Sequence, residues 1–537
     1  MALIRLRGFA GEIRALHPAL LPDNVGVAIR NAKPGRGDLR PWKVPLAVAT
    51  VPSGRSTIYR MGRDVASDAN YWLSWTSVVH AVRGFDPGDT TERTYYTGDG
   101  APKVTNSTLA LSSAPYPTAN RPLGLPAPAS ACAVTGSGGG TSETNVTAFY
   151  VYTYVSDWGW ESAPSPASAE HTRKSDETAT LTSFAAVPAG NYGVDRIRIY
   201  RTQTGSSGAT EFFFLREIAY GTTSTTDDNR DLGEVLETTT WATPPSDLTH
   251  LTSMWAGMLA GISGNRVRLC EPYAAYAWPD AYDVVPPDSK PVALGVVGQQ
   301  LLVLTTARPL LVAGTAPDSL DQQPLEFSQA CVSARSAVSM GAGVAWASED
   351  GLCWYGAGGA RILTAGLMTR EDWQALVPSS IVGKLYEGLY FGSYDDGSGR
   401  KGFFIDPANP TGIYFLDTGY AAMHFDELQD QLYVLDGTSV KRWDAGASAM
   451  TWRFRSKVFK LPRPINFGCA EVIADAFPVT LRVWADGVLK HSQTVSAAGA
   501  LRLPSGFRAT DWQLEVEGAT AVQGVNLATT VAELAEA

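Results

Sequence analysis

The chain has 537 residues, which is too long for one hydrophobic core, so about three or four domains are expected. Charged residues make up only 18% of the chain, while glycine (52) and proline (33) are plentiful. This composition favours many short strands joined by turns over long solvated helices. The net charge of −10 argues against a protein that binds nucleic acid tightly, because such proteins usually carry more basic than acidic residues.

The cysteines are odd in number, far apart and without a CxxC pair: Cys132, Cys270, Cys331, Cys353 and Cys469. Neither a disulfide framework nor a zinc site is therefore expected, and single buried thiols in a reducing cytoplasm are. The first nine residues contain two arginines and no long apolar run, which is not typical of a signal peptide. No stretch of about 18 apolar residues predicts a transmembrane helix, so we expect no membrane anchor.

Residues 1–55 are interpreted as an extended N-terminal arm or platform, because prolines along them forbid a long helix: Pro18, Pro22, Pro34, Pro41, Pro45 and Pro52. Residues 56–112 follow with short apolar runs that predict strands, and the turn at Gly98-Asp99-Gly100 favours a hairpin. Residues 113–142 are rich in proline, alanine, serine and glycine. We interpret them as a linker.

Residues 143–245 predict an inserted β-sandwich of their own. The stretches 146–155 and 196–201 alternate between apolar and polar residues in period two, as strands of a sandwich do. The stretch 159–166, Gly-Trp-Glu-Ser-Ala-Pro-Ser-Pro, resembles the strand-to-loop exit of fibronectin type III domains. We therefore expect a fibronectin III-like insertion.

Residues 246–449 contain an internal repeat. Similar apolar units begin with Gly or Gln and continue into a polar turn and a second strand, and their anchors are Met258, Leu301, Val344, Leu389 and Leu432. Successive anchors lie 43, 43, 45 and 43 residues apart. A period of roughly 40–50 residues with about four short strands is typical of β-propeller blades. Strands within 57–105 are expected to add one or two blades.

One helix is expected to interrupt the repeat at 369–377, starting in a capping-box-like pair of Thr369 and Asp372 and ending at Pro378. Residues 450–537 alternate around the turn at Asp486-Gly487 and predict a further sandwich-like β domain. The expected fold class is thus all-β: a β-propeller body, an inserted fibronectin III-like β-sandwich and a C-terminal β-sandwich-like domain.

An enzyme built on such a body would need assembled catalytic residues. The six histidines are scattered, and neither HExxH nor G-x-S-x-G occurs: His17, His80, His171, His250, His424 and His491. Carboxylates cluster at Asp395-Asp396 and at Asp426, Glu427 and Asp430, and paired carboxylates could cleave a glycosidic bond. Both clusters lie in glycine-rich or polar turns, so we interpret them as solvated loops.

Two further carboxylate patterns suggest turns. Ser348–Trp354, with Asp350, is similar to an Asp-box of sialidase-type propellers, but its glycine comes one place early and no other unit repeats it. The group Asp227-Asp228-Asn229 with Asp231 suggests calcium, yet the EF-hand glycine and terminal glutamate are missing. We expect a plain turn and a metal-free loop. The sequence therefore predicts no catalytic, cofactor-binding or metal-binding residue, and no enzyme.

Four patches spread along the chain resemble the tail nozzle proteins of podovirus-type bacteriophages, a family also called tail tubular protein B. These patches are NAKPGRGDLRP at 31–41, DTTERTYYTGDGAPK at 89–103, SKVFKLPRPINF at 456–467 and LPSGFR at 503–508. The resemblance implies a propeller body, a platform that docks on the head-to-tail adaptor, and a homo-hexameric ring around the DNA exit channel. The insertion at 143–245 departs from the simplest nozzle proteins.

The same resemblance implies a place in the virion tail, after assembly in the host bacterial cytoplasm, with tail fibre or spike proteins as neighbours. Genomic DNA would pass through the ring without sequence-specific binding. Duplex DNA carries about one negative charge per 1.7 Å, so a basic lumen would hold it tightly. A subunit with a net charge of −10 meets the need for release better than a basic one.

Two alternatives stay open beside the nozzle. One is another tail or receptor-binding structural protein, which would bind host cells as free protein. The other is a glycan-cleaving tail enzyme, which would release reducing sugar from host polysaccharide. An assembled hexamer would favour the nozzle.

Overall fold

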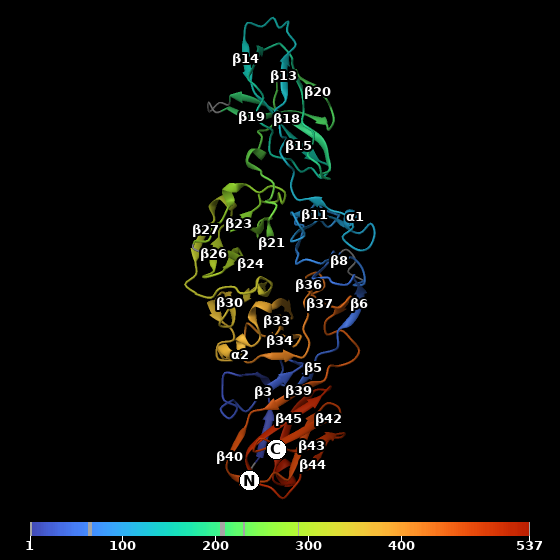
Figure 1. Ribbon diagram of the computed structural model, residues 1–537, viewed down its shortest axis with the longest axis vertical. Helices are drawn as coiled ribbons and strands as arrows, with labels where there is room; N and C mark the ends of the chain where they lie inside the picture. Colours follow the sequence, from blue (N-terminus) through green and yellow to red (C-terminus); the bar gives the residue numbers. More distant parts are fainter. Residues whose placement is uncertain (1–2, 63–66, 205–209, 229–230, 288, 536–537) are drawn as a thin grey trace.

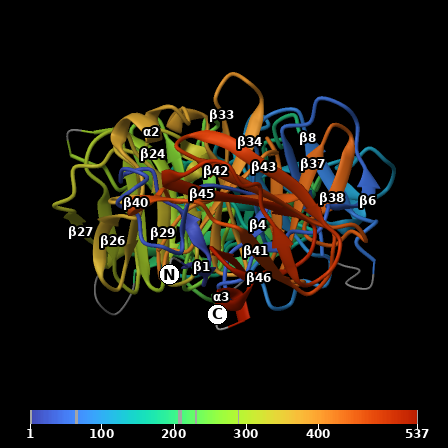
Figure 2. The ribbon, with the colours of Figure 1, turned by 90° about the horizontal axis from the view of Figure 1, so that it is seen from below.

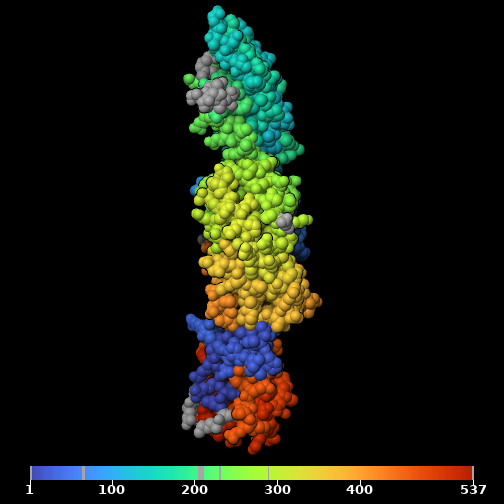
Figure 3. Space-filling view, turned by 90° about the vertical axis from the view of Figure 1, so that its left-hand side faces the viewer, coloured from blue at the N-terminus to red at the C-terminus, as the bar shows by residue number. Residues whose placement is uncertain are grey.

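The computed structural model describes residues 3–62, 67–204, 210–228, 231–287 and 289–535. It is all-β, with 46% of residues in strands and 5% in helices, which confirms the expected fold class at this level. Figure 1 shows three parts along one long axis: an inserted part at the top, a middle part of small sheets, and a lower part that contains both chain ends. The space-filling view in Figure 3 shows the same narrow stack from the side.

Within the described residues, the middle part consists of seven antiparallel sheets along the chain, the sixth of which is one end of an 11-stranded sheet that continues into the lower part. The first two come before the insertion. They contain β7 (Thr57–Arg60) with β8 (Trp72–Trp75), and then β9 (His80–Arg83), β10 (Thr94–Thr97), β11 (Lys103–Thr105) and β12 (Arg121–Pro122). The short helix α1 (Ser107–Ala110) follows β11.

The other five sheets come after the insertion. Three of them contain β21 (Thr249–Ser253), β22 (Leu259–Ser263) and β23 (Arg266–Leu269); β24 (Pro291–Val297), β25 (Gln300–Thr305), β26 (Leu310–Ala313) and β27 (Asp321–Pro324); and β28 (Val338–Ser339), β29 (Gly343–Ala347), β30 (Leu352–Gly356) and β31 (Gly359–Ile362). The last two contain β32 (Val382–Tyr386), β33 (Leu389–Asp395), β34 (Arg400–Ile405) and β35 (Tyr414–Leu416); and β36 (Met423–Asp426), β37 (Gln431–Asp436), β38 (Ser439–Arg442) and β6 (Leu46–Thr50).

The apolar repeat lies on the second strand of five successive sheets and not, as the sequence predicted, on the first. Met258 directly precedes β22, and the other four anchors lie on β25, β29, β33 and β37. The second strand has a partner on each side, and in β29 every residue is buried. A strand that is covered on both faces needs a continuous apolar run. The pattern therefore marks the inside of each sheet and not its start.

The first and last sheets are neighbours by packing, and the last sheet is completed by a strand that directly precedes the first sheet in the chain. β6, from the N-terminal segment, pairs with β38 and completes the last sheet. The first strands of neighbouring sheets contact one another in the order β9, β21, β24, β28, β32, β36 and β7. The indole of Trp75 on β8 packs against Tyr96 on β10, with ring centroids 5.2 Å apart. In Figure 2, seen from below, β24 and β26 lie on one side, and β37, β38 and β6 on the other.

The inserted part has its own core. Its strands are β13 (Ala133–Gly136), β17 (Ala179–Thr182) and β20 (Ser224–Asp227); β14 (Asn145–Ala148) and β16 (His171–Lys174); and β15 (Tyr150–Ser156), β18 (Val194–Thr204) and β19 (Thr210–Ala219). Alternate tyrosines of β15 are fully buried with Ile197 and Ile199 of β18, because side chains two residues apart share one face. The expected alternation between buried and more exposed residues is seen at Arg196–Ile199, whereas every residue of β15 is buried.

The stretch 113–142 is not the linker that the sequence predicted. Its residues Arg121–Pro122 form β12 in a sheet of the middle part, and Ala133–Gly136 form β13 in the inserted part. Both strands lie at the edge of their sheets, where proline is tolerated because one side of the strand needs no hydrogen-bond partner. The composition therefore indicated edge strands as well as loops.

The insertion leaves and rejoins the middle part at one place. A Cβ added to Gly124 would lie 2.8 Å from Cδ of Pro244, so the outgoing and returning segments touch. Trp160 of the insertion stacks on Tyr276 of the middle part, with ring centroids 4.9 Å apart and planes 17° from parallel. The insertion thus has a core of its own, and it joins the middle part through Trp160, which is buried in the middle part's core, and through side chains such as Trp158 and Tyr192 that pack against that core.

Deleting residues 127–240 and joining Pro126 to Trp241 through a short Gly-Ser linker should leave the other two parts folded. The two ends are adjacent, and the edge of Tyr276 stays covered by Trp241, whose ring lies 5.7 Å away. The expected result is a soluble protein with one cooperative transition fewer by calorimetry. Insoluble protein, or loss of every cooperative transition, would show that the parts fold only together.

The lower part is built from both ends of the chain. One sheet contains β1 (Leu3–Arg7), β46 (Val522–Ala528), β41 (Cys469–Ala474) and β44 (Ala500–Arg502). The other continues from β35 of the middle part through β3, and contains β3 (Val25–Arg30), β39 (Trp452–Ser456), β45 (Ala509–Gly518), β42 (Val479–Ala485) and β43 (Val488–Val495), with β2 (Ala10–Glu12) beside β3 and β40 (Phe459–Ile465) beside β45. The pair β4 (Ala32–Lys33) and β5 (Arg40–Pro41) and the helix α3 (Val531–Ala535) complete it.

The N-terminal segment is therefore not the extended arm that the sequence predicted. β1 pairs with β46 and β3 with β39, and Leu6 and Ile29 are fully buried in the core that the C-terminal strands share. The prolines do exclude a long helix, but apart from Pro41 they fall between strands. Short apolar runs between these prolines, such as Val25–Arg30, therefore form strands that pair with other strands.

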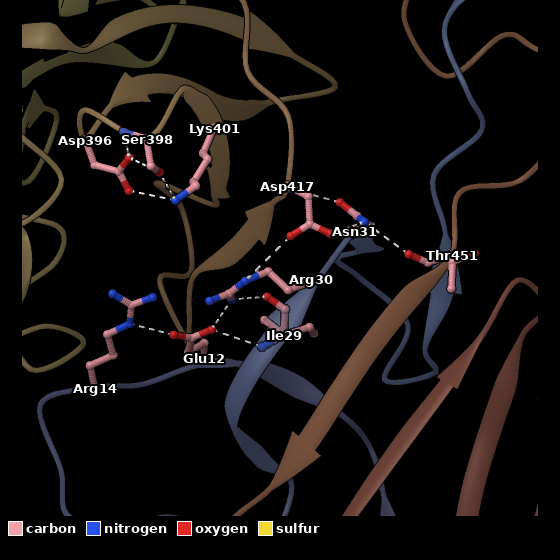
Figure 4. A network of polar contacts seen from close by, with 10 residues as sticks. All are labelled: Glu12, Arg14, Ile29, Arg30, Asn31, Asp396, Ser398, Lys401, Asp417 and Thr451. Carbon is pink, nitrogen blue, oxygen red and sulfur yellow. Dashed lines mark hydrogen bonds and ion pairs between the residues drawn. The ribbon is translucent and has the colours of Figure 1, made fainter. Parts of the chain in front are cut away.

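A polar network joins the lower part to the middle part (Figure 4). The Glu12 carboxylate is buried and accepts hydrogen bonds from Arg14 Nε (2.5 Å), Arg30 Nη1 (2.7 Å) and the Ile29 backbone N–H (3.0 Å). The two guanidinium groups lie over the ring of Phe415 on β35, at 4.4 and 5.0 Å from its centroid. Buried Glu12 therefore fixes the N-terminal segment against β35.

Further bonds extend the same junction. The Asn31 side-chain amide donates to Asp417 Oδ2 (2.9 Å) and to the Thr451 carbonyl oxygen (3.1 Å), while its Oδ1 accepts from the Asp417 backbone N–H (3.1 Å). These residues come from three distant segments of the chain. Their bonds hold the N-terminal segment, the end of β35 and the start of β39 together.

The expected helix is short. α2 (Arg370–Gln374) begins after Thr369, whose hydroxyl oxygen accepts a hydrogen bond from the Asp372 backbone N–H at 3.1 Å. The predicted N-terminal cap is thus confirmed, and the helix ends before Pro378. No helix among the described residues has the length and apolar character needed to span a membrane.

Candidate functional site

A cavity of about 700 Å³ lies between the sheets of the middle part. It is lined by residues of β7, β9, β21, β24, β28, β32 and β36, which are the first strands of the seven sheets. First strands are less apolar than second strands because one of their faces meets this space and not another side chain. The cavity is thus the place where all seven sheets present side chains together.

Basic side chains are concentrated in the cavity. They are Arg60, His80, Arg83, His250, Arg335, Lys384 and His424. Arg335 stands on a short 3₁₀ turn before β28, and this turn contacts β32, which carries Lys384. The Arg335 guanidinium Nη2 donates to the backbone carbonyls of Ser56 (3.3 Å) and Ala421. Its position is therefore fixed by the backbone of two other segments.

Arg60 and Asp426 form a buried ion pair at the cavity, with Nη1 3.0 Å from Oδ2. Both side chains are almost fully removed from solvent. The sequence predicted Asp426 in a solvated loop, and the structure corrects this: it ends β36 and its charge is matched by Arg60 on β7, a residue that is remote in sequence. Glu427 and Asp430, in contrast, are exposed as expected.

Three of the six histidines meet in the cavity. The rings of His80 and His250 lie 4.5 Å apart, and His424 packs at 5.0 Å from Tyr59. The Arg60 backbone N–H donates to His424 Nε2 at 3.4 Å, so that nitrogen is an acceptor and the neutral ring carries its proton on Nδ1. The histidines that looked scattered in the sequence are thus partly clustered in space.

Burial keeps these histidines neutral near pH 7. It lowers the pKa of His80 to about 3, and the charges of Lys384 and Arg335 act in the same direction. Burial likewise lowers the pKa of His424 to about 3, with Lys384 and Arg60 adding to the effect. Burial also lowers the pKa of Lys384 itself, and the nearby Arg335 charge lowers it further.

The carboxylates considered for glycan cleavage lie apart from this cavity. Asp395 ends β33, and its Oδ1 accepts from the Gly397 backbone N–H at 3.1 Å. Asp396 accepts from Ser398 and from Lys401 Nζ (2.8 Å), and the hydrogen bond from Lys401 is the main cause of its lowered pKa. Figure 4 shows Asp396, Ser398 and Lys401 around one turn. These contacts support the expected turn.

Asp350 also lies in a turn. Its backbone N–H donates to Ser348 Oγ (3.3 Å), and its side chain accepts from Gln329 (2.8 Å) and lies 3.1 Å from Arg370 Nε. All its contacts tie a surface turn to its neighbours. The structure thus agrees with the expectation of a turn in place of an Asp-box.

Asp227 does not lie in the loop that the sequence predicted. It ends β20 and is fully buried, and its carboxylate accepts from Tyr150 Oη (2.7 Å), Arg173 Nη2 (2.8 Å) and Arg201 Nη1 (2.7 Å). The two arginines supply the charge that calcium would have supplied. Asn229, part of the same sequence pattern, lies outside the described residues.

The described residues contain no group of three or more His, Cys, Asp or Glu side chains placed to hold a metal ion.

The five cysteines are buried and form no disulfide bonds, as the sequence predicted. The tryptophans among the largest fully buried side chains are Trp42, Trp278, Trp346, Trp373, Trp443, Trp452 and Trp512.

The sequence did not predict the basic cavity, although one signal pointed to it. His250 and His424 stand at the same offset before the anchors Met258 and Leu432 of their repeats. A polar residue at a fixed offset before each apolar run indicates a face that several repeats share. Arg335 and Lys384 do not keep this offset, so only the structure brings them together with the histidines.

No protein-family model matches the chain, and no curated protein does. Among solved structures, the chain is similar to AztD from Citrobacter koseri, with a TM-score of 0.27, 11% identity, and coverage of 67% of this chain and 100% of that one. It is similar to an exo-beta-1,3-galactanase from Phanerochaete chrysosporium, with a TM-score of 0.20, 10% identity, and coverage of 89% and 100%.

A third similar structure is PorZ of Porphyromonas gingivalis, with a TM-score of 0.23, 12% identity, and coverage of 88% of this chain and 78% of that one. Similarities at these TM-scores support no conclusion about the activity, the ligands or the partners of this chain.

Proposed function

We propose that this chain is a structural subunit of a short bacteriophage tail, and that six copies form a nozzle ring around the DNA exit channel below the head-to-tail adaptor. The observation that carries the proposal concerns three of the four nozzle-like patches, 31–41, 456–467 and 503–508. They lie far apart in sequence, yet Leu39 and Phe467 are buried in one core of the lower part.

Side chains from the last two patches pack against that same core. Leu461 and Ile465 belong to 456–467, and Leu503 and Phe507 belong to 503–508. The rings of Phe467 and Phe507 both contact Trp512, at 4.8 and 5.8 Å between centroids. These patches resemble one family and contribute to one core, which supports the interpretation of that structural unit as the platform of the family. In this proposal the lower part is the platform that docks on the adaptor.

We further propose that the seven sheets of the middle part form a seven-bladed β-propeller. The support is the lining of one cavity by every first strand, together with the pairing of β6 with β38, which brings a strand from before the first blade into the last blade. A propeller exposes side surfaces and two faces, and such a body can pack against neighbours in a ring. The fibronectin III-like insertion projects from the end opposite the platform.

The inserted part is the natural contact for tail fibre or spike proteins in this proposal, because it lies farthest from the platform (Figure 1). DNA would pass the ring without sequence-specific binding. The net charge of −10 supports a lumen from which DNA is released, since a basic wall would hold the phosphates. The basic cavity described above lies inside one subunit and is distinct from that lumen.

Two assays on purified protein test the proposal against its alternatives. We expect no release of reducing sugar from host surface polysaccharide and no binding of the free protein to host cells. Turnover that disappears when Asp395, Asp396 or Asp350 is changed to Asn would identify a glycan-cleaving enzyme and overturn the proposal. Saturable binding to cells would favour a receptor-binding protein instead. A heat-denatured sample is the control in both assays.

A further inference from the structure

The cavity between the seven sheets holds positive charge that its own carboxylates do not match. Arg335 and Lys384 both line it, and neither forms an ion pair with a carboxylate in the part of the chain that the structure describes. Among the lining carboxylates, Asp426 is engaged by Arg60 at 3.0 Å, and Glu92 lies 3.6 Å from Arg83.

Glu427 is the remaining lining carboxylate, and it does not balance the two cations. It is exposed to solvent, and its charge is the smallest of the influences on Lys384. Three neutral histidines add polar surface without adding negative charge. Four arginine and lysine side chains thus line the cavity against three carboxylates, and only two of those carboxylates, Asp426 and Glu92, form an ion pair with a lining cation.

Arg335 and Lys384 are half-buried. Two like charges without a carboxylate partner are costly there, because each loses hydration and repels the other. The guanidinium group of Arg335 is held in the cavity wall, since its Nη2 donates hydrogen bonds to the backbone carbonyls of Ser56 and Ala421. Lys384 stands on the strand β32 next to the turn that carries Arg335. The arrangement holds both cations at one wall of a cavity, as sites for anions do.

We propose that this cavity binds a small oxyanion, a phosphate or carboxylate group, between Lys384 and Arg335. A guanidinium and an ammonium group offer several N–H donors that match the oxygens of either group. The volume of about 700 Å³ accommodates an anion that carries an organic body, because small-molecule sites typically span about 300–1,000 Å³. This site is independent of the assignment to a phage tail.

The test is calorimetric titration of the full chain with inorganic phosphate and, separately, with citrate, at pH 7 and constant ionic strength set with chloride. At least one of the two anions should bind once per chain and raise the thermal midpoint with its concentration. Lys384→Gln should weaken that binding at least about tenfold, and Arg335→Gln by a similar factor, because a charged hydrogen bond is lost in each.

Two matched variants make the result specific. Lys441→Gln removes a lysine that is paired with Asp436 away from the cavity, and it should bind as the parent does. Lys384→Arg keeps the charge and should keep most of the affinity. The comparison of phosphate with citrate identifies the anion class. Absence of binding for both anions, or equal binding by the parent, Lys384→Gln and Arg335→Gln, would mean that water alone occupies the cavity and would overturn the site.

Discussion

Changing Glu12 to Gln should lower the free energy of unfolding of the joined middle and lower parts by about 3 kcal/mol, since two partly buried guanidinium groups then lose their buried counter-charge. The Glu12 carboxylate is bonded to Arg14, Arg30 and the Ile29 backbone N–H. Glutamine keeps the shape but brings an N–H₂ group towards two guanidinium groups. The measurement is urea denaturation followed by tryptophan fluorescence.

Asp417→Asn is the matched control for Glu12→Gln. Asp417 belongs to the same network, but its side chain is 61% exposed, so its ion pair with Arg30 is screened by water. The expected loss is below about 1 kcal/mol. Equal losses in the two variants would show that the position of Glu12 between the two parts of the molecule has no special effect on stability.

Acidification from pH 7 to pH 5 should destabilise the middle part through His80 and His424, each by about 2 kcal/mol. Both have a folded pKa of about 3, below the ordinary value of about 6.5. Between these values the unfolded chain binds protons that the folded chain does not. Their contribution to stability is therefore complete above about pH 6.5 and is lost as the pH falls towards 3.

The measurement is the thermal midpoint of the middle part by calorimetry at pH 7 and pH 5, at constant ionic strength. The double variant His80→Gln and His424→Gln should lose clearly less stability between the two pH values than the parent. His491→Gln, which lies on β43 of the lower part, should leave the pH dependence unchanged. The assignment fails if the double variant and the parent show the same pH dependence.

Sequence patterns predicted the local β structure well and its long-range pairing poorly. Period-two alternation located β15 and β18, and the buried apolar runs located the second strands of five sheets. Neither pattern reveals which strands pair across a long stretch of chain. The N-terminal segment was thus predicted as an arm, although β1 and β3 pair with C-terminal strands.

The same limit explains the candidate site. Asp426 and Asp227 sit in polar sequence that is typical of solvated turns, and only their remote partners, Arg60 and the pair Arg173 and Arg201, explain why they are buried. The basic residues of the cavity come from strands that are far apart in the sequence, so they become neighbours only in the folded chain. Turn residues with local bonds, such as Asp396 with Ser398, were predicted correctly because their contacts are close in sequence.

The most direct test of the proposed function is a density map of the tail of intact virus particles that contain this chain. We expect six copies in a ring, with the lower part against the adaptor, contacts of about 2,000 Å² or more between neighbours, and a lumen wall that is acidic or neutral. A monomeric spike, a threefold fibre, or a channel lined mainly by lysine and arginine would contradict it.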